Sequence, residues 1–335
     1  MKIVIPMAGR GTRLRPHTLT VPKPLIPVAG KPIVHRLVED IVKVCGQPVE
    51  EIAFIIGADF GEAVEQQLKG IAESLGAKGG ICYQTEKLGT AHALLCAKDY
   101  LEGNVVIAFA DTLFKADFTL DNNAEAIIWT QKVEDPSAFG VVKLDENGYI
   151  TDFVEKPKTF VSDLAIIGIY YFRDGAFLRD EMQYLIDNDI KDRGEYQITD
   201  ALENMKTKGA KFQTGQVTEW LDCGNKDATV YTNQRYLEYI KDQDLVDASA
   251  KVVNSVIIPP VFIGQNAEIH NSVIGPHVSI GKDSKIADAI IKNTIIQEDS
   301  EVSQANLTNS MIGNKVVYKG KSADLSIGDY NQLKE

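Results

Sequence analysis

Short apolar runs alternate with longer stretches of helical periodicity over residues 2–110. This alternation is typical of an α/β sheet built from βαβ-type units. In open sheets of this class, ligands bind outside the carboxyl ends of the strands. We therefore expect the loop around Gly9 and the carboxylate of Asp111 to face one crevice. Strands are predicted over 2–7, 51–57, 81–84 and 105–110, and helices over 32–45, 60–75 and 90–101.

The segment from 126 to 172 is richer in strand-forming residues. Its DENG sequence at 145–148 predicts a hairpin turn between strands over 140–144 and 149–154. Further along the chain, helices are predicted over 175–188, 196–208 and 227–240, with a strand over 211–217.

A different pattern begins near Leu245, where apolar residues recur at steps of five or six positions. Three such hexapeptides make one triangular turn of a parallel β-helix, because each apolar side chain points into a narrow prism and the next small residue lets the chain turn. The spacing from Ile263 to Ile280, Ile296 and Ile312 predicts about three turns. The recurring positions are Ile263, Ile269, Ile274, Ile280, Ile286, Ile291, Ile296, Val302, Leu307 and Ile312.

Charge and composition exclude several classes of function. The formal net charge of -12 argues against sequence-independent binding of nucleic acid phosphates. The longest apolar runs, 52–56 and 165–171, are shorter than the roughly 20 residues that span a bilayer, and the chain opens without a signal-peptide pattern. The four cysteines include no C-x-x-C pair, so neither a zinc site nor a disulfide framework is indicated. We expect a cytoplasmic protein with neither a nucleic acid nor a membrane partner.

Basic residues gather in one loop of this acidic chain. Arg10, Arg13, Arg15 and Lys23 lie close together in a segment rich in glycine and proline, directly after the first predicted strand. Glycines there would let backbone N–H groups approach a phosphate chain. The loop lacks both the Rossmann fingerprint and the Walker A pattern. A rigid, irregular segment that carries Arg13 and Lys23 instead suits a triphosphate with a leaving pyrophosphate.

The sequence GRGTRLRP at 9–16, followed by PKPLIPVAGKP at 22–32, resembles the signature of the sugar-1-phosphate nucleotidyltransferases. That family includes glucose-1-phosphate thymidylyltransferase, UDP-N-acetylglucosamine pyrophosphorylase and mannose-1-phosphate guanylyltransferase. The resemblance implies a Rossmann-like nucleotidyltransferase domain with a mixed central sheet over 1–244, and a left-handed parallel β-helix over 245–335. Further matching segments are YQ at 83–84, LGTAHA at 88–93, AD at 110–111, FGVV at 139–142, EKP at 155–157, GEY at 194–196 and WLDCG at 220–224.

The resemblance also implies a reaction and its residues. A hexose 1-phosphate would attack the α-phosphorus of a nucleoside triphosphate and release pyrophosphate, with Mg²⁺ held by Asp111 and Asp222. Arg13 would hold the pyrophosphate, Lys23 the α-phosphate and Lys156 the sugar phosphate. The implied nucleotide-binding residues are Ala8, Gly9, Gly11, Thr12, Gln84, Gly89 and Thr90, and the implied sugar-phosphate-binding residues are Gly140, Glu155, Lys156 and Gly168.

Several alternatives stay open. The LGTAHA segment most resembles that of uridylyl- and thymidylyl-transferring family members, which favours UTP or dTTP. Glucose 1-phosphate is the first choice of acceptor, and N-acetylglucosamine 1-phosphate is the second. Ile167 stands where the family often has Asn or Thr, so the sugar is not fixed. Taken alone, Asp111 fits a strand-end cap better than a metal ligand, because carboxylates commonly occupy such turns. The β-helix is compatible with a homo-oligomer, with acyl transfer, or with an inactive scaffold that keeps the fold. Against acyl transfer, the repeat is short, its histidines are His270 and His277 alone, and no extended loop offers an acyl-CoA site.

Overall fold

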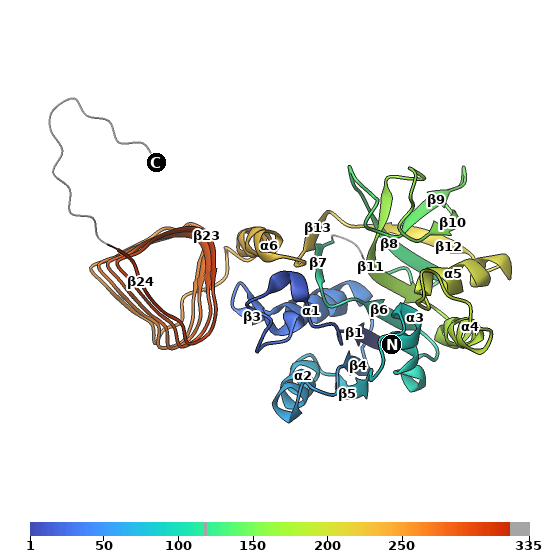
Figure 1. Ribbon diagram of the computed structural model, residues 1–335, viewed down its shortest axis with the longest axis horizontal. Coiled ribbons are helices and arrows are strands. Elements are labelled where there is room, and N and C mark those ends of the chain that lie inside the picture. Colours follow the sequence, from blue (N-terminus) through green and yellow to red (C-terminus); the bar gives the residue numbers. More distant parts are fainter. Residues whose placement is uncertain (117–118, 322–335) are drawn as a thin grey trace. The chain divides into compact units, whose positions relative to one another are not determined.

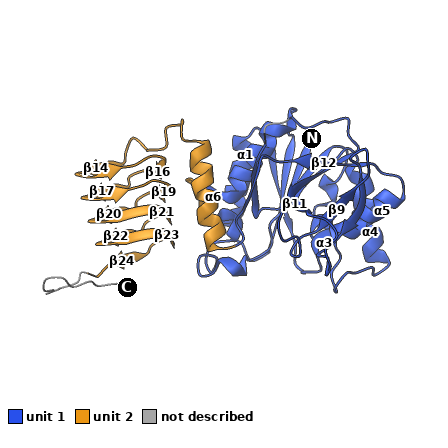
Figure 2. Cartoon of the chain, turned by 90° about the horizontal axis from the view of Figure 1, so that it is seen from above, with its two compact units in different colours: residues 1–26, 31–224 blue, residues 27–30, 225–335 orange. Residues whose placement is uncertain are grey.

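The computed structural model describes residues 1–116 and 119–321, which form two compact units (Figure 1). Unit 1 comprises Met1–Ile26 and Lys31–Gly224, and unit 2 comprises Pro27–Gly30 and the chain from Asn225 onward (Figure 2). The domain boundary predicted after residue 244 stays a prediction. The two compact units meet along the chain between Gly224 and Asn225. No helix in the described part of the chain is long and apolar enough to span a membrane.

Unit 1 is built on a mixed sheet with the strand order β10-β9-β11-β6-β1-β4-β5, which confirms the predicted sheet type. Strand β1 pairs in parallel with β4 and β6, whereas β11 is antiparallel to β6. Strand β8 lies beside β11 and pairs in parallel with β12. The strands are β1 (Lys2–Pro6), β4 (Glu51–Ile56), β5 (Lys78–Tyr83), β6 (Val105–Ala108), β8 (Ala126–Lys132), β9 (Val141–Leu144), β10 (Ile150–Val154), β11 (Leu164–Phe172) and β12 (Phe212–Gln216).

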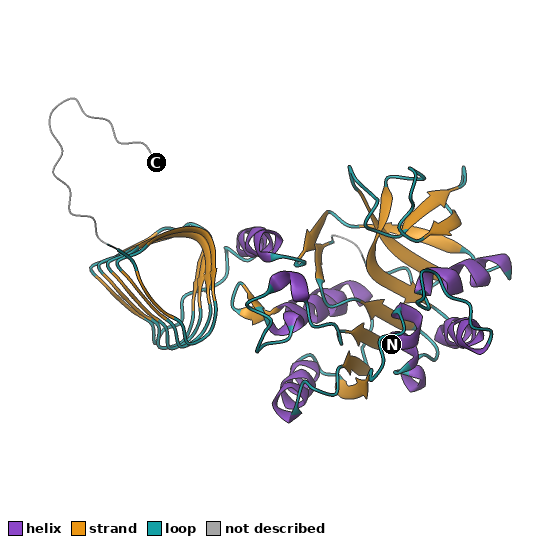
Figure 3. Ribbon diagram, viewed as in Figure 1, coloured by secondary structure: helices purple, strands orange, loops and turns teal. Residues whose placement is uncertain are grey.

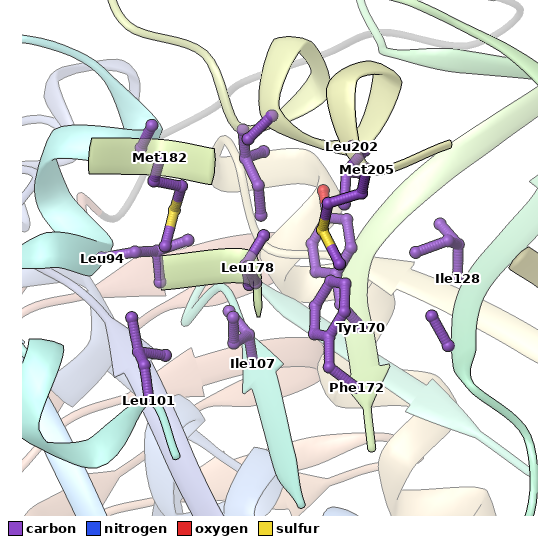
Figure 4. Close-up of a cluster of buried hydrophobic side chains, with 14 of the residues drawn as sticks. Leu94, Leu101, Ile107, Ile128, Tyr170, Phe172, Leu178, Met182, Leu202 and Met205 are labelled. Atoms are coloured by element: carbon purple, nitrogen blue, oxygen red, sulfur yellow. The ribbon is translucent and has the colours of Figure 1, made fainter. Parts of the chain in front are cut away.

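The helices of unit 1 surround this sheet (Figure 3). Apolar side chains of α3, α4 and α5 form one buried cluster with side chains of the central strands, including Leu94, Leu178, Ile107 and Tyr170 (Figure 4). Both faces of β1 are buried, which explains the continuous apolar run in its sequence. The helices are α1 (Ile33–Cys45), α2 (Glu62–Ser74), α3 (Thr90–Leu95), α4 (Gly175–Asp187) and α5 (Ile198–Thr207), with 3₁₀ turns η1 (Thr12–Leu14), η2 (Lys23–Leu25) and η3 (Lys98–Tyr100).

The predicted helix over 90–101 is wrong in length, because α3 ends at Leu95. The amide of Cys96 bonds to the carbonyls of both His92 and Ala93, and the next amide bonds to the carbonyl of Leu94. This change to i to i+3 spacing tightens the last turn, and the chain continues as η3.

Unit 2 contains the parallel β-helix predicted from the hexapeptide spacing, and its outline is triangular when seen end on (Figure 1). Ile263 pairs with Ile280, Ile280 with Ile296, and Ile296 with Ile312, as the spacing predicts. The strands are stacked in Figure 2. They are β14 (Lys251–Val253), β15 (Val256–Ile257), β16 (Val261–Ile263), β17 (Glu268–His270), β18 (Val273–Ile274), β19 (Val278–Ile280), β20 (Lys285–Ala287), β21 (Ile290–Ile296), β22 (Glu301–Ser303), β23 (Asn306–Ile312) and β24 (Val317–Lys319).

The β-helix begins inside the predicted segment 245–335, one turn before Ile263, the first recurring position named from the sequence. Strand β14 pairs with β17, and β15 pairs with β18, so the chain from Lys251 is already part of the β-helix. Val252 and Ile257 continue the five- and six-residue steps backward from Ile263. Neither residue was among the recurring positions named from the sequence.

Short polar residues form corners of the β-helix. Asn254, Asn271 and Asp288 all have positive φ, a region that Asn and Asp tolerate better than other residues with a Cβ. The side-chain amide of Asn254 donates to Asn271 at 2.8 Å, and that of Asn271 donates to Asp288 at 3.2 Å. This ladder satisfies polar groups that would otherwise compete for the backbone.

Helix α6 (Lys226–Tyr239) packs against β21 and β23 within unit 2. Oε1 of Glu238 on this helix lies 2.7 Å from Nε2 of His277. The hydrogen bond from His277 is the main cause that lowers the pKa of Glu238, and the charge of Lys241 acts in the same direction.

We expect Glu238→Gln to lower the free energy of unfolding near neutral pH by up to about 1 kcal/mol, the size of a solvent-accessible ion pair. A carboxylate with a lowered folded pKa stabilises the fold above its unfolded pKa of about 4.5, and this contribution is lost as the pH falls through the folded pKa. Urea unfolding of both proteins at about pH 7 and about pH 3 measures the effect. The two free energies should differ at the higher pH and converge at the lower one; an equal difference at both would contradict the ion pair.

Candidate active site

A cavity of about 410 Å³ opens at the carboxyl ends of β1, β5 and β6 in unit 1. The Gly9 loop, defined as residues 7–14, forms one wall, and Asp111 forms another. Loop and carboxylate therefore share one crevice. Residues assigned to the site from the sequence that line the cavity are Ala8, Gly9, Gly11, Thr12, Arg13, Lys23, Gln84, Gly89, Thr90 and Asp111.

Gly11 allows the stem of Lys23 to cross the Gly9 loop. Its φ of +62° lies in the left-handed region, at the start of η1. A Cβ at this position would lie 2.5 Å from the Cβ of Lys23, so only glycine fits. The hydroxyl of Thr18 donates to the Gly11 carbonyl at 2.8 Å. The loop and the lysine thus fix each other's position.

Lys23 carries a buried charge. Its side chain is 8% exposed, and Nζ lies 3.2 Å from Oδ2 of Asp111, whose side chain is 48% exposed. A buried ammonium group needs an acceptor, and Asp111 supplies it while keeping a hydrated side. The pair places one fixed cation and one accessible carboxylate at the cavity wall.

The two aspartates assigned to the metal lie at the same end of two paired strands, Asp111 directly before β7 and Asp222 at the end of β13. Strand β7 (Thr112–Lys115), which the sequence did not predict, pairs antiparallel with β13 (Glu219–Asp222), and Asp222 lies opposite Thr112. The amide of Cys223 donates to the carbonyl of Asp111 at 3.1 Å. The strand ladder therefore brings Asp111 and Asp222 together from distant parts of the sequence.

The donor set of this aspartate pair fits Mg²⁺. Oδ1 of Asp222 accepts from the Gly224 amide at 2.9 Å, which orients the carboxylate. The described part of the chain has no cluster of three or more His, Cys, Asp or Glu side chains that could hold a metal ion. Mg²⁺ commonly uses one or two carboxylates and takes its other oxygens from water and substrate phosphates, so two aspartates suffice.

Arg13 reaches the same wall from η1. Arg13 and Gly224 both line the cavity. A Cβ on Gly224 would lie 3.3 Å from Nη2 of Arg13 and 2.7 Å from Oδ2 of Asp222. Asp222 itself is not part of the cavity lining, and it lies directly behind Gly224. One wall thus gathers two cations and two carboxylates around the Gly9 loop.

The segment assigned to base recognition bridges two helices. Gln84 follows β5, and its backbone N–H donates to the carbonyl of Ile56 at 2.9 Å. The hydroxyl of Thr90 donates to Oε1 of Gln197 at 3.1 Å and accepts from the amide of Ile198 at 2.9 Å. Thr90 therefore ties the start of α3 to the start of α5 in addition to lining the cavity.

We expect Gly89→Ala to destabilise the protein by more than about 1 kcal/mol. Gly89 has a φ of +116°, and a Cβ there would lie 2.3 Å from the carbonyl oxygen of Tyr196, which as backbone cannot move aside. Denaturant unfolding measures the change. The matched control is Gly70→Ala within α2, where nothing lies within 4 Å of the added Cβ. The control should gain up to about 1 kcal/mol from helix propensity, and equal losses in both variants would contradict the close approach.

The residues assigned to the sugar phosphate form a separate cluster outside the cavity lining. We call Gly140, Glu155 and Lys156 the sugar-side cluster. A Cβ on Gly140 would lie 3.0 Å from Oε2 of Glu155, and Nζ of Lys156 lies 3.3 Å from Oε1 of the same carboxylate. The hairpin of β9 and β10 brings these residues together, because the Lys156 amide donates to the Phe139 carbonyl at 3.1 Å.

Three aromatic residues connect the sugar-side cluster and Gly168 with the rest of the site. The ring of Phe139 packs edge-on against Trp220, at 5.0 Å between centroids, and Trp220 is two residues from Asp222. The carbonyl of Gly168 accepts from the amide of Phe109 at 2.9 Å, and Phe109 lines the cavity. Gly168 therefore contacts the cavity through Phe109.

Sequence reasoning missed three charged residues near the site. Lys87 and Glu195 line the cavity, and Arg193 donates to the carbonyls of Glu155 at 3.4 Å and Lys156 at 2.7 Å. Glu195 lies inside the matched GEY segment, Arg193 directly precedes it, and Lys87 directly precedes the LGTAHA segment. Their adjacency to those segments was the available signal.

Acidic groups shape the field around the sugar-side cluster. Burial, and then the charges of Asp192 and Glu155, raise the pKa of Asp200. Burial, and then the charge of Glu155, also raise the pKa of Tyr170, which is almost fully buried. Lys156 and Arg193 are the cations that contact Glu155 in this acidic setting.

Two family models match the chain. The model described as nucleotidyl transferase matches residues 2–239, which include the Gly9 loop and both aspartates. The model described as GlmU-like, C-terminal hexapeptide matches residues 239–304, which run from the end of α6 through most of the β-helix.

Three curated relatives illustrate the range of similar proteins. The chain is 35% identical over 246 residues to the low-salt glycan biosynthesis nucleotidyltransferase Agl11 of Haloferax volcanii, covering 71% of this chain and 66% of the relative. It is 31% identical over 266 residues to the bifunctional protein GlmU of Methanococcus vannielii, covering 77% and 61%. It is 32% identical over 292 residues to the glucose-1-phosphate thymidylyltransferase of Streptomyces antibioticus, covering 79% and 78%. The chain thus spans slightly less than two thirds of the first two relatives.

A solved structure of UDP-glucose pyrophosphorylase complexed with UDP-glucose shares the fold, with a TM-score of 0.58 and 24% identity over 71% of this chain and 98% of that one. At this identity the likeness shows the fold alone. The family model, in contrast, covers most of the chain and contains the wall where the cations and carboxylates meet. This chain belongs to the nucleotidyl transferase family.

Proposed function

We propose that this chain transfers a nucleotidyl group from UTP or dTTP to a hexose 1-phosphate, with glucose 1-phosphate as the first choice, and releases pyrophosphate. The observation that carries the proposal is the gathering of Arg13, Lys23, Asp111 and Asp222 around one cavity. Catalysis of phosphoryl-type transfer depends mostly on positioning and on stabilising charge, and this wall offers both.

The reaction joins one oxygen to phosphorus and releases another. An oxygen of the sugar phosphate forms a bond to the α-phosphorus, while the bond from the α-phosphorus to the β-phosphate oxygen breaks and its electron pair leaves with pyrophosphate. Lys23 would neutralise charge on the α-phosphate oxygens, and Arg13 would hold the departing pyrophosphate. A buried, pre-positioned cation serves this role better than a mobile surface one, because it needs no reorganisation during the reaction.

The aspartates would hold Mg²⁺, which when bound supplies charge neutralisation between the reacting phosphates. The chain prepares for this in two ways. The β7–β13 ladder fixes the spacing of Asp111 and Asp222, and the Gly224 amide orients one oxygen of Asp222.

The sugar-side cluster would bind the acceptor. Lys156 would contact the sugar phosphate, and Glu155 and the Gly140 backbone would bind hydroxyls. Lys156 has a φ of +39°, which is unusual for a residue with a Cβ, and Arg193 donates to its carbonyl at 2.7 Å. This contact supports Arg193 as a positioning residue for Lys156.

Similarity supports the choice of substrates. One relative is a glucose-1-phosphate thymidylyltransferase, and another, 38% identical over 192 residues, is the catalytic subunit beta of a mannose-1-phosphate guanylyltransferase from Drosophila melanogaster. GTP and mannose 1-phosphate therefore belong in the test. Mg²⁺ as the metal, a homo-oligomer and the cytoplasm stay predictions from the sequence.

The test incubates the purified protein and Mg²⁺ with each of UTP, dTTP, GTP, ATP and CTP, in combination with glucose, N-acetylglucosamine or mannose 1-phosphate. Pyrophosphate release is followed. The proposal expects the fastest release with UTP or dTTP and glucose 1-phosphate. Preference for another pair would correct the substrates, and silence with every pair would overturn the function.

Acyl transfer is the second candidate, because the hexapeptide region matches a GlmU-like model. His277 is engaged with Glu238, which leaves His270 on β17 as the histidine of the repeat to consider. Incubation with acetyl-CoA and glucosamine 1-phosphate decides the matter. Release of free coenzyme A that depends on the amino sugar would support acyl transfer, and its absence would remove this candidate.

A further inference from the structure

The turn that follows Lys23 is held by unit 2. Residues Pro27–Gly30 belong to that unit, although the sequence on both sides of them belongs to unit 1. The amide of Ala29 donates to Oδ1 of Asn233 in α6 at 2.8 Å, and both residues are fully buried. The ring of Phe262 lies 2.2 Å from where a Cβ of Gly30 would stand. Residues of helix α6 and strand β16 therefore both contact the turn.

The backbone of this turn is unfavourable without such support. Ala29 has a φ of +48° and Gly30 a φ of +85°. Glycine adopts this region freely, but a residue with a Cβ does so at a cost. Strained positions persist where the surrounding structure over-determines them, and they cluster at functional sites. The hydrogen bond from the Ala29 amide to Asn233 restrains the strained residue directly.

Little chain separates the turn from Lys23. Only Pro24, Leu25 and Ile26 intervene, and the amide of Ile26 donates to the Lys23 carbonyl at 3.0 Å. Pro24 and Pro27 each fix their own φ. A displacement of the turn is therefore passed along this short, stiff segment to Lys23.

We propose that Asn233 is a positioning residue for Lys23, acting through the strained turn at Ala29. The proposal rests on the proposed function, because that function gives Lys23 its role at the α-phosphate. Asn233 lies 210 positions after Lys23 in the sequence and contacts neither substrate nor metal in the proposed mechanism. The helix and β-helix of unit 2 thereby become necessary for catalysis, beyond any part they play in assembly.

A second contact of Asn233 supplies a matched control. The hydroxyl of Ser279 donates to the same Oδ1 at 2.7 Å. Ser279→Ala removes a buried hydrogen bond to Asn233 but leaves the bond from Ala29 in place. Asn233→Ala removes both. A merely structural role of Asn233 would make the two variants differ in stability alone.

The test measures kcat and KM for wild type, Asn233→Ala, Ser279→Ala, Lys23→Ala and the double variant of Asn233 and Lys23. We expect Asn233→Ala to lower kcat between about tenfold and 10²-fold, because small displacements of a positioned group have effects of this size. KM for the sugar phosphate and the kinetics of Ser279→Ala should stay unchanged. The double variant should be no slower than Lys23→Ala, since coupled residues show non-additive effects.

Hydrogen exchange at the Ala29 amide is measured in parallel, and Asn233→Ala should accelerate it. Faster exchange with unchanged kcat would overturn the positioning role, as would additive losses in the double variant. If Asn233→Ala does not fold, Phe262→Leu perturbs the same turn and is read by the same criteria. A wild-type protein that releases no pyrophosphate would overturn the proposed function and this role with it, and the exchange data would then judge the Ala29 contact alone.

Discussion

Lys23→Ala is expected to lower kcat by about 10²- to 10³-fold, the usual loss when one pre-positioned charge is removed from a transition state. The side chain is 8% exposed and ends 3.2 Å from Asp111, so no solvent cation can take its exact place. Pyrophosphate release under saturating substrates measures kcat. The fold should survive, because Asp111 is 48% exposed and stays hydrated without its partner.

The control for this variant is Lys43→Ala. Lys43 also pairs with an aspartate, Asp40 at 3.1 Å, but its side chain is 69% exposed and lies on α1. Its removal should leave kcat unchanged. If the Lys23 variant behaved like the Lys43 variant, Lys23 would be a structural residue and the proposed stabilisation of the α-phosphate would be wrong.

Asp111→Asn is expected to lower kcat by a similar factor, about 10²- to 10³-fold, and to raise the Mg²⁺ concentration needed for half-maximal rate. The neutral amide keeps the shape of the side chain but loses the charge that Mg²⁺ prefers. Asp222→Asn should act in the same direction, because the β7–β13 ladder places both carboxylates at one wall. Rates measured over a Mg²⁺ titration separate the loss of metal affinity from the loss of rate.

Asp180→Asn on α4 serves as the control for the loss of a carboxylate, because Asp180 pairs with Arg179 far along the sequence from both aspartates. Removal of metal by EDTA should silence the wild type, and added Mg²⁺ should restore it. Asp111→Asn with an unchanged Mg²⁺ dependence would contradict the metal role, even if its rate were low.

The β-helix could be predicted well because its repeat is local. Each turn needs an inward apolar residue at a fixed step, so the spacing of Ile263, Ile280 and Ile296 already contains the register that the strands adopt. The turn before Ile263 lies within the segment assigned to the β-helix, although Val252 and Ile257 were not among the recurring positions. The α/β class was predicted for the same kind of reason, since several strands of the sheet are short apolar runs, whereas the mixed strand directions were implied by the family resemblance.

The details of the site were harder to predict because they depend on contacts between distant residues. The motifs at 9–16 and 22–32 indicated that Gly11 and Lys23 belong to one phosphate-binding segment, but not that Gly11 leaves room for the lysine stem. Strand β7 is too short to show a period, so the ladder that joins Asp111 to Asp222 appears only in the structure.

Some residues near the site belong to no pattern that the sequence alone reveals. Lys87 reads as an ordinary surface lysine, yet it lines the cavity. In the sequence Asn233 is one polar residue in a polar helix. In the structure it is fully buried, and its Oδ1 accepts a hydrogen bond from the amide of Ala29. Burial of a polar group is decided by tertiary packing, which periodicity within α6 does not reveal.

The most direct test of the central claim measures pyrophosphate release and nucleotide-sugar formation together, with and without glucose 1-phosphate, in Mg²⁺ with UTP or dTTP. We expect both products to appear in equal amounts, only when the sugar phosphate is present, and Asp111→Asn to lose both. Pyrophosphate that appears without the sugar phosphate, or with no nucleotide-sugar to match it, would contradict transfer to a hexose 1-phosphate.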